Sequence, residues 1–232
     1  MSINYCKSSK FSNPSNNALN ATALRAFVNS PIIWETIKYF AVRTSEVIVC
    51  ENDKRTNISV ESRISDFERF IANLVWHSKV RVATLMFFLV YLNRLKTRFQ
   101  NCIGHLNTPY RLFLVNLILT AKYLNDKLPW NKEWAKYVFL RAVDANGDNL
   151  GYGFHFSIAG VNEMERQLFD LLSWDLKIEN SDLYYELEIF LKPIRFKISE
   201  KAIKKGRWWI HGRSNTTIPS NCRVALKKLS II

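Results

Sequence analysis

Glycine, proline and cysteine are scarce in this sequence: its 232 residues include seven Gly, six Pro and four Cys. Hydrophobic residues, in contrast, make up 48% of the chain, which is enough for a sizeable core. Leu, Ile, Phe and Tyr recur in runs that are too long for most β-strands. The sequence therefore predicts a mostly helical globular protein of the all-α class.

The small number of cysteines argues against a disulfide framework and against a zinc site. Cys6, Cys50, Cys102 and Cys222 are scattered, without a C-x-x-C pair and without a His at ligand spacing. We expect free thiols in a reducing, intracellular compartment, and no bound metal.

The motifs of common enzyme classes are missing as well. The chain has no Gly-rich phosphate loop, no G-x-S-x-G and no H-E-x-x-H. We therefore assign no catalytic residue and no cofactor, and we expect that the protein is not an enzyme.

The longest apolar runs are too short to cross a bilayer. "VATLMFFLVYL" and "LFLVNLILTAKYL" fall short of the roughly 20 residues that a membrane-spanning helix needs, so they predict buried helices instead. The first twenty residues are polar and lack the apolar core of a secretory signal. We expect a protein of the nucleus, the cytoplasm or both.

The positive charge is concentrated at the C-terminal end. The formal net charge is +13, but from Lys192 onward eleven basic residues face the single acid Glu200, which gives this segment a net charge of +10. Only +3 is left for the rest of the chain. The basicity therefore belongs to a tail, and the part before it is nearly neutral.

Helical periodicity and turn residues divide the chain into five parts. Residues 1–20, rich in Asn and Ser, are expected to be disordered, and residues 21–59 to form an N-terminal helical extension. Residues 60–178 read as five helices with short connections, the fifth capped by Ser157. Residues 179–193 form a last helix that ends at Pro193, and residues 194–232 form the basic tail, which we expect to be flexible.

Two charged residues lie at helix positions where the pattern predicts apolar residues. In the third helix of the series, apolar side chains cover every direction, and Lys122 projects beside Ile118 and Val115. In the fifth helix, Glu165 is the only acid aimed toward the apolar stripe. Either each charge marks the edge of its apolar face and reaches solvent, or the two helices pack together and leave both charges at a groove that binds a partner. Spacing alone leaves both interpretations open.

The order of several motifs resembles a known family. "TLMFFLVYLNRLK", "TPYRLFLVNLILTAKYLND", "NKEWAKY" and "FSIAGVNEMERQLFDLLSWDL" are similar to the cyclin box, specifically that of the PHO/PCL-type cyclins of budding yeasts. The segment "ALRAFVNSPIIWETIKYFAVRTSEVIV" resembles the helical region before the box in the same group. The resemblance covers residues 23 to 192 and excludes the tail.

The resemblance implies a fold, a partner and two site residues. Such cyclins are non-catalytic subunits, built on a five-helix box around a central third helix. They bind and activate a cyclin-dependent kinase of the Pho type as a heterodimer, and they direct it to protein substrates in the cell cycle at G1 or in nutrient control. In cyclins a lysine of the third helix and a glutamate of the fifth contact the kinase, and "TAKYLND" and "MERQL" place these at Lys122 and Glu165.

The sequence also departs from the family pattern. The first box helix lacks the M-R-A-I-L-type patch by which some cyclins dock substrates, and Gly160 stands where an acid would complete a capping box after Ser157. The tail keeps an alternative open, because "KKGRWWIHGR" combines basic residues with Trp208 and Trp209. A cyclin-fold transcription factor that binds nucleic acid through this tail is that alternative; a solvated end, a nuclear-import segment or packing of the two Trp on the bundle would explain the same residues.

Overall fold

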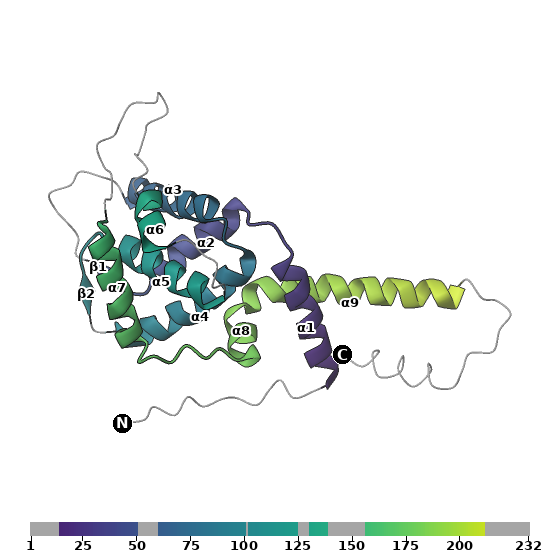
Figure 1. The fold of residues 1–232 in the computed structure, drawn as a ribbon. Helices are drawn as coiled ribbons and strands as arrows, with labels where there is room; N and C mark the ends of the chain where they lie inside the picture. The colour runs from purple at the N-terminus through teal and green to yellow at the C-terminus, as the bar shows by residue number, and fades with distance from the viewer. Residues whose placement is uncertain (1–13, 51–59, 101, 125–129, 139–155, 212–232) are drawn as a thin grey trace. The chain divides into compact units, whose positions relative to one another are not determined.

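The structure, a computed structural model, describes residues 14–50, 60–100, 102–124, 130–138 and 156–211. Helices dominate this part of the chain, and the only strands in it are two residues long, so the all-α prediction is confirmed (Figure 1). In order, the elements are α1 (Pro14–Val28), α2 (Trp34–Ser45), β1 (Val49–Cys50), α3 (Val60–Ser78), α4 (Val82–Arg98), β2 (Ile103–Gly104), α5 (Thr108–Leu124), α6 (Asn131–Val138), α7 (Ile158–Leu171), α8 (Asn180–Glu186) and α9 (Glu188–His211).

The chain divides into two compact units. The larger unit comprises Leu24–Leu191, and the smaller one comprises Met1–Ala23 together with Lys192–Ile232. Within the smaller unit, Arg195 of α9 donates a hydrogen bond from Nη1 to Oδ1 of Asn20 on α1 at 3.0 Å. The five box helices predicted for residues 60–178 all belong to the larger unit, as α3 to α7.

Helix α5 forms the centre of the larger unit, as its apolar periphery predicts. It packs against α2, α3, α4 and α7 (Figure 1). Every residue from Leu112 to Ala121 is buried, including the polar Asn116 and Thr120. The Thr120 hydroxyl donates to the carbonyl of Asn116 at 2.6 Å, and Asn116 Nδ2 donates to the carbonyl of Phe88 at 3.1 Å. These bonds offset part of the cost of burying the two polar side chains; Oδ1 of Asn116 is also buried and has no hydrogen-bond partner among the described residues.

A series of aromatic rings connects the helices around α5. Phe88 of α4 lies between Phe40 of α2 and Phe113 of α5, with ring centroids 5.5 and 4.8 Å apart. Phe67 of α3 meets Phe113 edge to face at 6.2 Å. Because such rings bury large areas and favour tilted contacts, they fix the crossing of four helices at one point.

The sequence does not predict the two short strands. β1 and β2 pair in parallel, with Val49 opposite Ile103 and Cys50 opposite Gly104. A Cβ placed on Gly104 would lie 2.9 Å from Oγ1 of Thr108 and 3.0 Å from Cδ1 of Ile48. Glycine therefore allows the chain to approach both the start of α5 and the segment before β1.

Helix α7 begins as predicted, with Ser157 as its N-cap. The Ser157 hydroxyl oxygen accepts a hydrogen bond from the backbone N–H of Gly160 at 3.0 Å. This bond satisfies one of the amide groups that every helix start leaves unpaired. The cap thus sets where Glu165 lies along α7.

Two boundaries differ from the sequence predictions. α1 begins at Pro14, within the stretch 1–20 expected to be disordered, and residues 1–13 lie outside the described part. The prediction that the last helix stops at Pro193 is wrong, since α9 continues through it to His211. The helix can continue because the φ angle of proline is helical and only one backbone hydrogen bond is lost. Beyond Pro193, the ion pair of Glu200 and Lys204, whose charged atoms are 2.8 Å apart, stabilises the following turns. The basic tail is therefore helical over residues 194–211, and residues 212–232 lie outside the described part.

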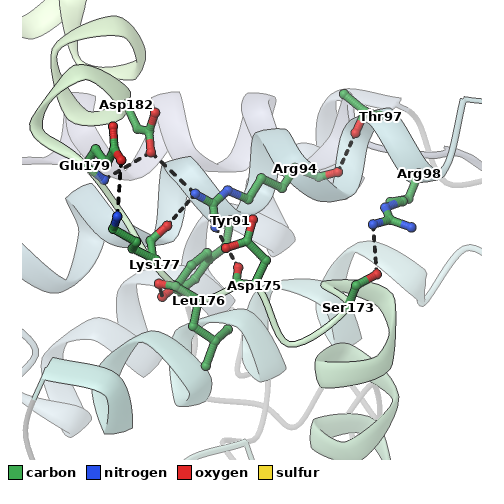
Figure 2. Close-up of polar contacts among 10 residues, drawn as sticks. All are labelled: Tyr91, Arg94, Thr97, Arg98, Ser173, Asp175, Leu176, Lys177, Glu179 and Asp182. Atoms are coloured by element: carbon green, nitrogen blue, oxygen red, sulfur yellow. Dashed lines mark hydrogen bonds and ion pairs between the residues drawn. The ribbon is translucent and has the colours of Figure 1, made fainter. Parts of the chain in front are cut away.

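Arg94 of α4 holds the segment that joins α7 to α8, as Figure 2 shows. Its guanidinium donates from Nη1 to the carbonyl of Asp175 at 2.6 Å and from Nη2 to the carbonyl of Lys177 at 2.7 Å. Nη2 also lies 3.4 Å from Oδ2 of Asp182 in the first turn of α8. We call this set of contacts the Arg94 clamp; it fixes the chain on both sides of α8's start.

Two neighbouring side chains of α4 extend the same contact (Figure 2). The Tyr91 hydroxyl donates to the carbonyl of Leu176 at 2.8 Å, and burial raises the pKa of this phenol well above its ordinary value. Arg98 donates from Nη2 to the Ser173 hydroxyl at 2.9 Å. The segment that follows α7 is thereby attached to α4 over about two helical turns, from Tyr91 to Arg98.

No helix among the described residues has the length and apolar character needed to span a bilayer.

Candidate functional site

The structure brings Lys122 and Glu165, the two predicted site residues, into direct contact. α5 packs against α7, and Lys122 Nζ lies 2.6 Å from Oε1 and 2.8 Å from Oε2 of Glu165. The packing of the two helices agrees with the groove interpretation. The alternative, in which each charge reaches solvent on its own, does not hold, because Lys122 and Glu165 form a bidentate salt bridge within the chain.

The two partners differ in how far they are exposed. The Lys122 side chain is 38% exposed, whereas the Glu165 side chain is 13% exposed. Lys122 also lies in the last turn of α5, where the partial negative charge of the helix end favours a cation. The Glu165 side chain is thus nearly enclosed, and the Lys122 side chain is partly accessible from outside.

Asn131, the first residue of α6, completes the polar cluster. Its Nδ2 donates to Oε2 of Glu165 at 2.7 Å and to Oδ1 of Asn162 on α7 at 2.7 Å. The fully buried Trp134 anchors α6 in the core, and Val138 is 2% exposed. We call Lys122, Glu165, Asn131 and Asn162 the α5–α7 polar cluster.

Apolar side chains occur next to this cluster along the chain. Tyr123 and Leu124 follow Lys122 at the end of α5 and are 45% and 39% exposed, and Trp130 precedes Asn131 and is 79% exposed. Exposed aromatic residues beside partly buried charges are typical of protein–protein contact surfaces. The polar cluster is thus followed or preceded in sequence by exposed apolar side chains.

Sequence reasoning found the pair but missed the two asparagines. Lys122 and Glu165 interrupt apolar stripes, so helical periodicity reveals them. Asn131 and Asn162 interrupt no stripe, and their contact joins two helices that periodicity treats separately. A polar residue at the start of a helix carries no such signal, because polar residues are common there.

A second buried acid, Glu186, lies at the end of α8. Its side chain is 9% exposed, and its Oε2 is 4.0 Å from Nη2 of Arg43 on α2. Burial raises the pKa of this carboxyl to about 7, against the opposing effects of Arg43 and a hydrogen bond with Asn93; Asp182 raises it further. It belongs to the packing of α8.

Comparisons with known proteins agree with this architecture. The family described as "Cyclin, N-terminal domain" matches residues 35–177, which include α2 to α7 and the whole α5–α7 polar cluster. No solved structure shows a significant match. Neither the family match nor the relatives described next support the nucleic-acid-binding alternative.

Three relatives from Saccharomyces cerevisiae are similar over most of the chain. PHO85 cyclin-9 is 38% identical over 175 residues, which cover 75% of this chain and 52% of that protein. PHO85 cyclin-1 is 33% identical, with 80% and 63% covered, and PHO85 cyclin-2 is 33% identical, with 87% and 67% covered. The chain thus spans between about half and two thirds of the length of these relatives. With the domain match and the packing of its helices around α5, the chain belongs to the cyclin family, and its relatives there are PHO85 cyclins.

Proposed function

We propose that this cyclin is a regulatory subunit that binds and activates a cyclin-dependent protein kinase of the Pho type and directs its choice of protein substrates. Family membership and the relatives' printed name, PHO85 cyclin, support this proposal. The observation that carries it is the α5–α7 polar cluster, because the cyclin resemblance assigns kinase contacts to Lys122 and Glu165.

In this proposal the kinase's regulatory helix docks against α5 and α7. The exposed side chains of Tyr123, Leu124 and Trp130 supply apolar contact area, and Lys122 and Glu165 set the register through charge-assisted hydrogen bonds. The bound cyclin favours the kinase conformation in which the kinase's own Lys–Glu pair is formed. The cyclin itself contributes no catalytic residue and no cofactor.

The salt bridge in the free cyclin suits such a docking site. Burying an unpaired charge in an interface costs far more than burying a charge that is already neutralised. Lys122 Nζ already meets both carboxylate oxygens, so docking would cover a pair whose geometry is set beforehand.

The same proposal covers the cellular setting. We propose that the complex acts in the nucleus, the cytoplasm or both, and the resemblance to PHO/PCL-type cyclins supports a role in the cell cycle at G1 or in nutrient control. Purification of the protein from a budding yeast, followed by identification of the bound kinase, tests the partner directly.

Substitutions in the salt bridge test the docking site. Lys122→Ala and Glu165→Ala should each weaken kinase binding by about 1.4 to 2.8 kcal/mol, roughly 10- to 100-fold in Kd, if the pair is desolvated in the complex. Kinase activation should fall in parallel at limiting cyclin. Isothermal titration with purified kinase and a kinase assay measure the two effects.

A reversed pair separates docking from simple stability. Lys122→Glu combined with Glu165→Lys retains a salt bridge within the cyclin but inverts the charges shown to the kinase. We expect a melting temperature within a few degrees of the parent protein and kinase binding as weak as in the single variants. Full binding by the reversed pair and by both alanine variants would show that the kinase docks elsewhere.

A further inference from the structure

Asn131 has an unusual arrangement of hydrogen bonds. Both hydrogens of its amide are used, one toward Oε2 of Glu165 and one toward Oδ1 of Asn162. Its carbonyl oxygen Oδ1 is buried and has no hydrogen-bond partner among the residues that the structure describes. An unpaired buried carbonyl costs free energy, so this side chain retains its orientation at some expense to stability.

The orientation of the amide follows from its neighbours. An ionised carboxylate only accepts hydrogen bonds, so the Asn131 atom at 2.7 Å from Glu165 must be the nitrogen. Turning the amide over would place its oxygen against Oε2 and add repulsion. Contact with Glu165 therefore decides the position of the Asn131 side chain.

Glu165 is held by two donors of different mobility. Oε2 accepts from Lys122 at 2.8 Å and from Asn131 at 2.7 Å. Lys122 has a long side chain that is 38% exposed, whereas Asn131 has a short one on a helix anchored by the buried Trp134. If the ammonium group turned toward another acceptor, the Asn131 bond would still hold the carboxylate.

We propose that Asn131 is a positioning residue of the kinase-docking site: it fixes the Glu165 carboxylate from the side of α6, so that Lys122 can turn an N–H toward a backbone carbonyl of the docked kinase. This inference rests on the proposed function and adds to it a third residue and separate roles for Glu165 and Lys122. Glu165 stays in place, and Lys122 provides the adjustable contact.

Two variants of Asn131 test this role, each measured for kinase affinity and for melting temperature. Asn131→Ala removes the donor and should raise the Kd for the kinase about 5- to 10-fold. Asn131→Asp keeps the shape and suits the first turn of α6, where an acid is favoured, but it repels Glu165. We expect Asn131→Asp to bind at least as weakly as Asn131→Ala and to have the lower melting temperature of the two, because its carboxylate lies against the nearly enclosed carboxylate of Glu165.

A double-mutant cycle shows whether Asn131 acts through Glu165. In a Glu165→Ala background, Asn131→Ala should change the Kd by less than twofold, because the carboxylate that it positions is gone. Lys136→Ala serves as the matched control on α6, since Lys136 is 69% exposed and pairs with Glu133 three residues before it. This control should bind the kinase like the parent protein.

The outcomes separate the inference from the proposed function. Parent-like binding by both Asn131 variants, together with weak binding by Lys122→Ala and Glu165→Ala, would overturn the positioning role and leave the docking site in place. An equal effect of Asn131→Ala with and without Glu165 would also overturn it. Parent-like binding by every variant of the cluster would instead refute the docking site itself.

Discussion

At the scale of single residues, Glu186 is a carboxyl whose protonation changes near neutral pH. Its carboxyl has an ordinary pKa of 4.5, which burial raises to about 7 in the folded protein. Between these two values the folded chain binds a proton that the unfolded chain releases. The contribution of Glu186 to stability is therefore fully present below about pH 4.5 and is lost as the pH rises through 7.

Glu186→Gln should remove this pH dependence. Gln resembles the protonated acid, so we expect the variant to match the parent protein at pH 5 and to exceed its unfolding free energy by on the order of 2 kcal/mol at pH 8. Urea unfolding at several pH values measures the difference between the two proteins, which cancels the titration of other groups. Two parallel stability curves would mean that Glu186 is ionised throughout this range.

Single residues also show what a sequence can reveal about a site. Lys122 and Glu165 stand out because each places a charge on an apolar helix face, and the structure brings the two together. That they bond to each other was not predictable, because periodicity describes one helix at a time. Asn131 and the Arg94 clamp depend on contacts between segments that lie tens of residues apart, and no local pattern encodes these.

At the scale of the elements, the segment that connects α7 to α8 is held in place by contacts with Arg94 of α4. Asp175 and Lys177 accept through their backbone carbonyls, and Oδ2 of Asp175 also lies 3.8 Å from Nη1 of Arg94. Arg94 in turn lacks an acidic partner within its own helix that would have explained it. The ion pair with Asp182 adds a contact to the first turn of α8.

Arg94→Ala should destabilise the larger unit by about 2 kcal/mol, because it removes two charge-assisted hydrogen bonds and the ion pairs with Asp175 and Asp182 at once. Arg98→Ala, one turn further along α4, removes a single bond to an exposed hydroxyl and should cost less than about 1 kcal/mol. Thermal or denaturant unfolding of both variants tests this order. Equal losses would show that the clamp is no stronger than an ordinary surface contact.

The elements were predictable to different degrees. The five box helices follow from apolar patterns and capping, because α3 and α7 have apolar stripes, α4 and α5 are long apolar runs, and Ser157 marks a start. The pairing of β1 and β2 did not follow, since two-residue strands are too short for a periodic pattern and need a partner over fifty residues away. The end predicted at Pro193 failed because a proline weakens a helix without always ending it.

At the scale of the whole molecule, the charge distribution and the two units coincide. The boundary after Leu191 falls where the basic segment begins, and Leu191 itself is fully buried. The larger unit therefore has a net charge close to neutral and contains the complete α5–α7 polar cluster.

Deleting residues 192–232 should leave kinase binding within about threefold of the full chain, since no residue of the docking site is removed. The net charge falls from +13 to +3, so the truncated protein should elute earlier from a cation exchanger. Deletion of residues 212–232 alone is the control. Loss of binding in the longer deletion but not in the shorter one would place part of α9 in the kinase interface.

Pro193 has a consequence for cooperativity within α9. It has no amide hydrogen to give to the carbonyl of Ile189, so the ladder of helical bonds is interrupted where the chain passes from one unit to the other. Before this point, Leu191 is buried and opens only when the larger unit unfolds; beyond it, Lys201–Lys204 are all exposed, and an exposed helix of this length is marginal in water. A single 24-residue helix thus contains two thermodynamic units, and its geometric continuity does not make it unfold in one step.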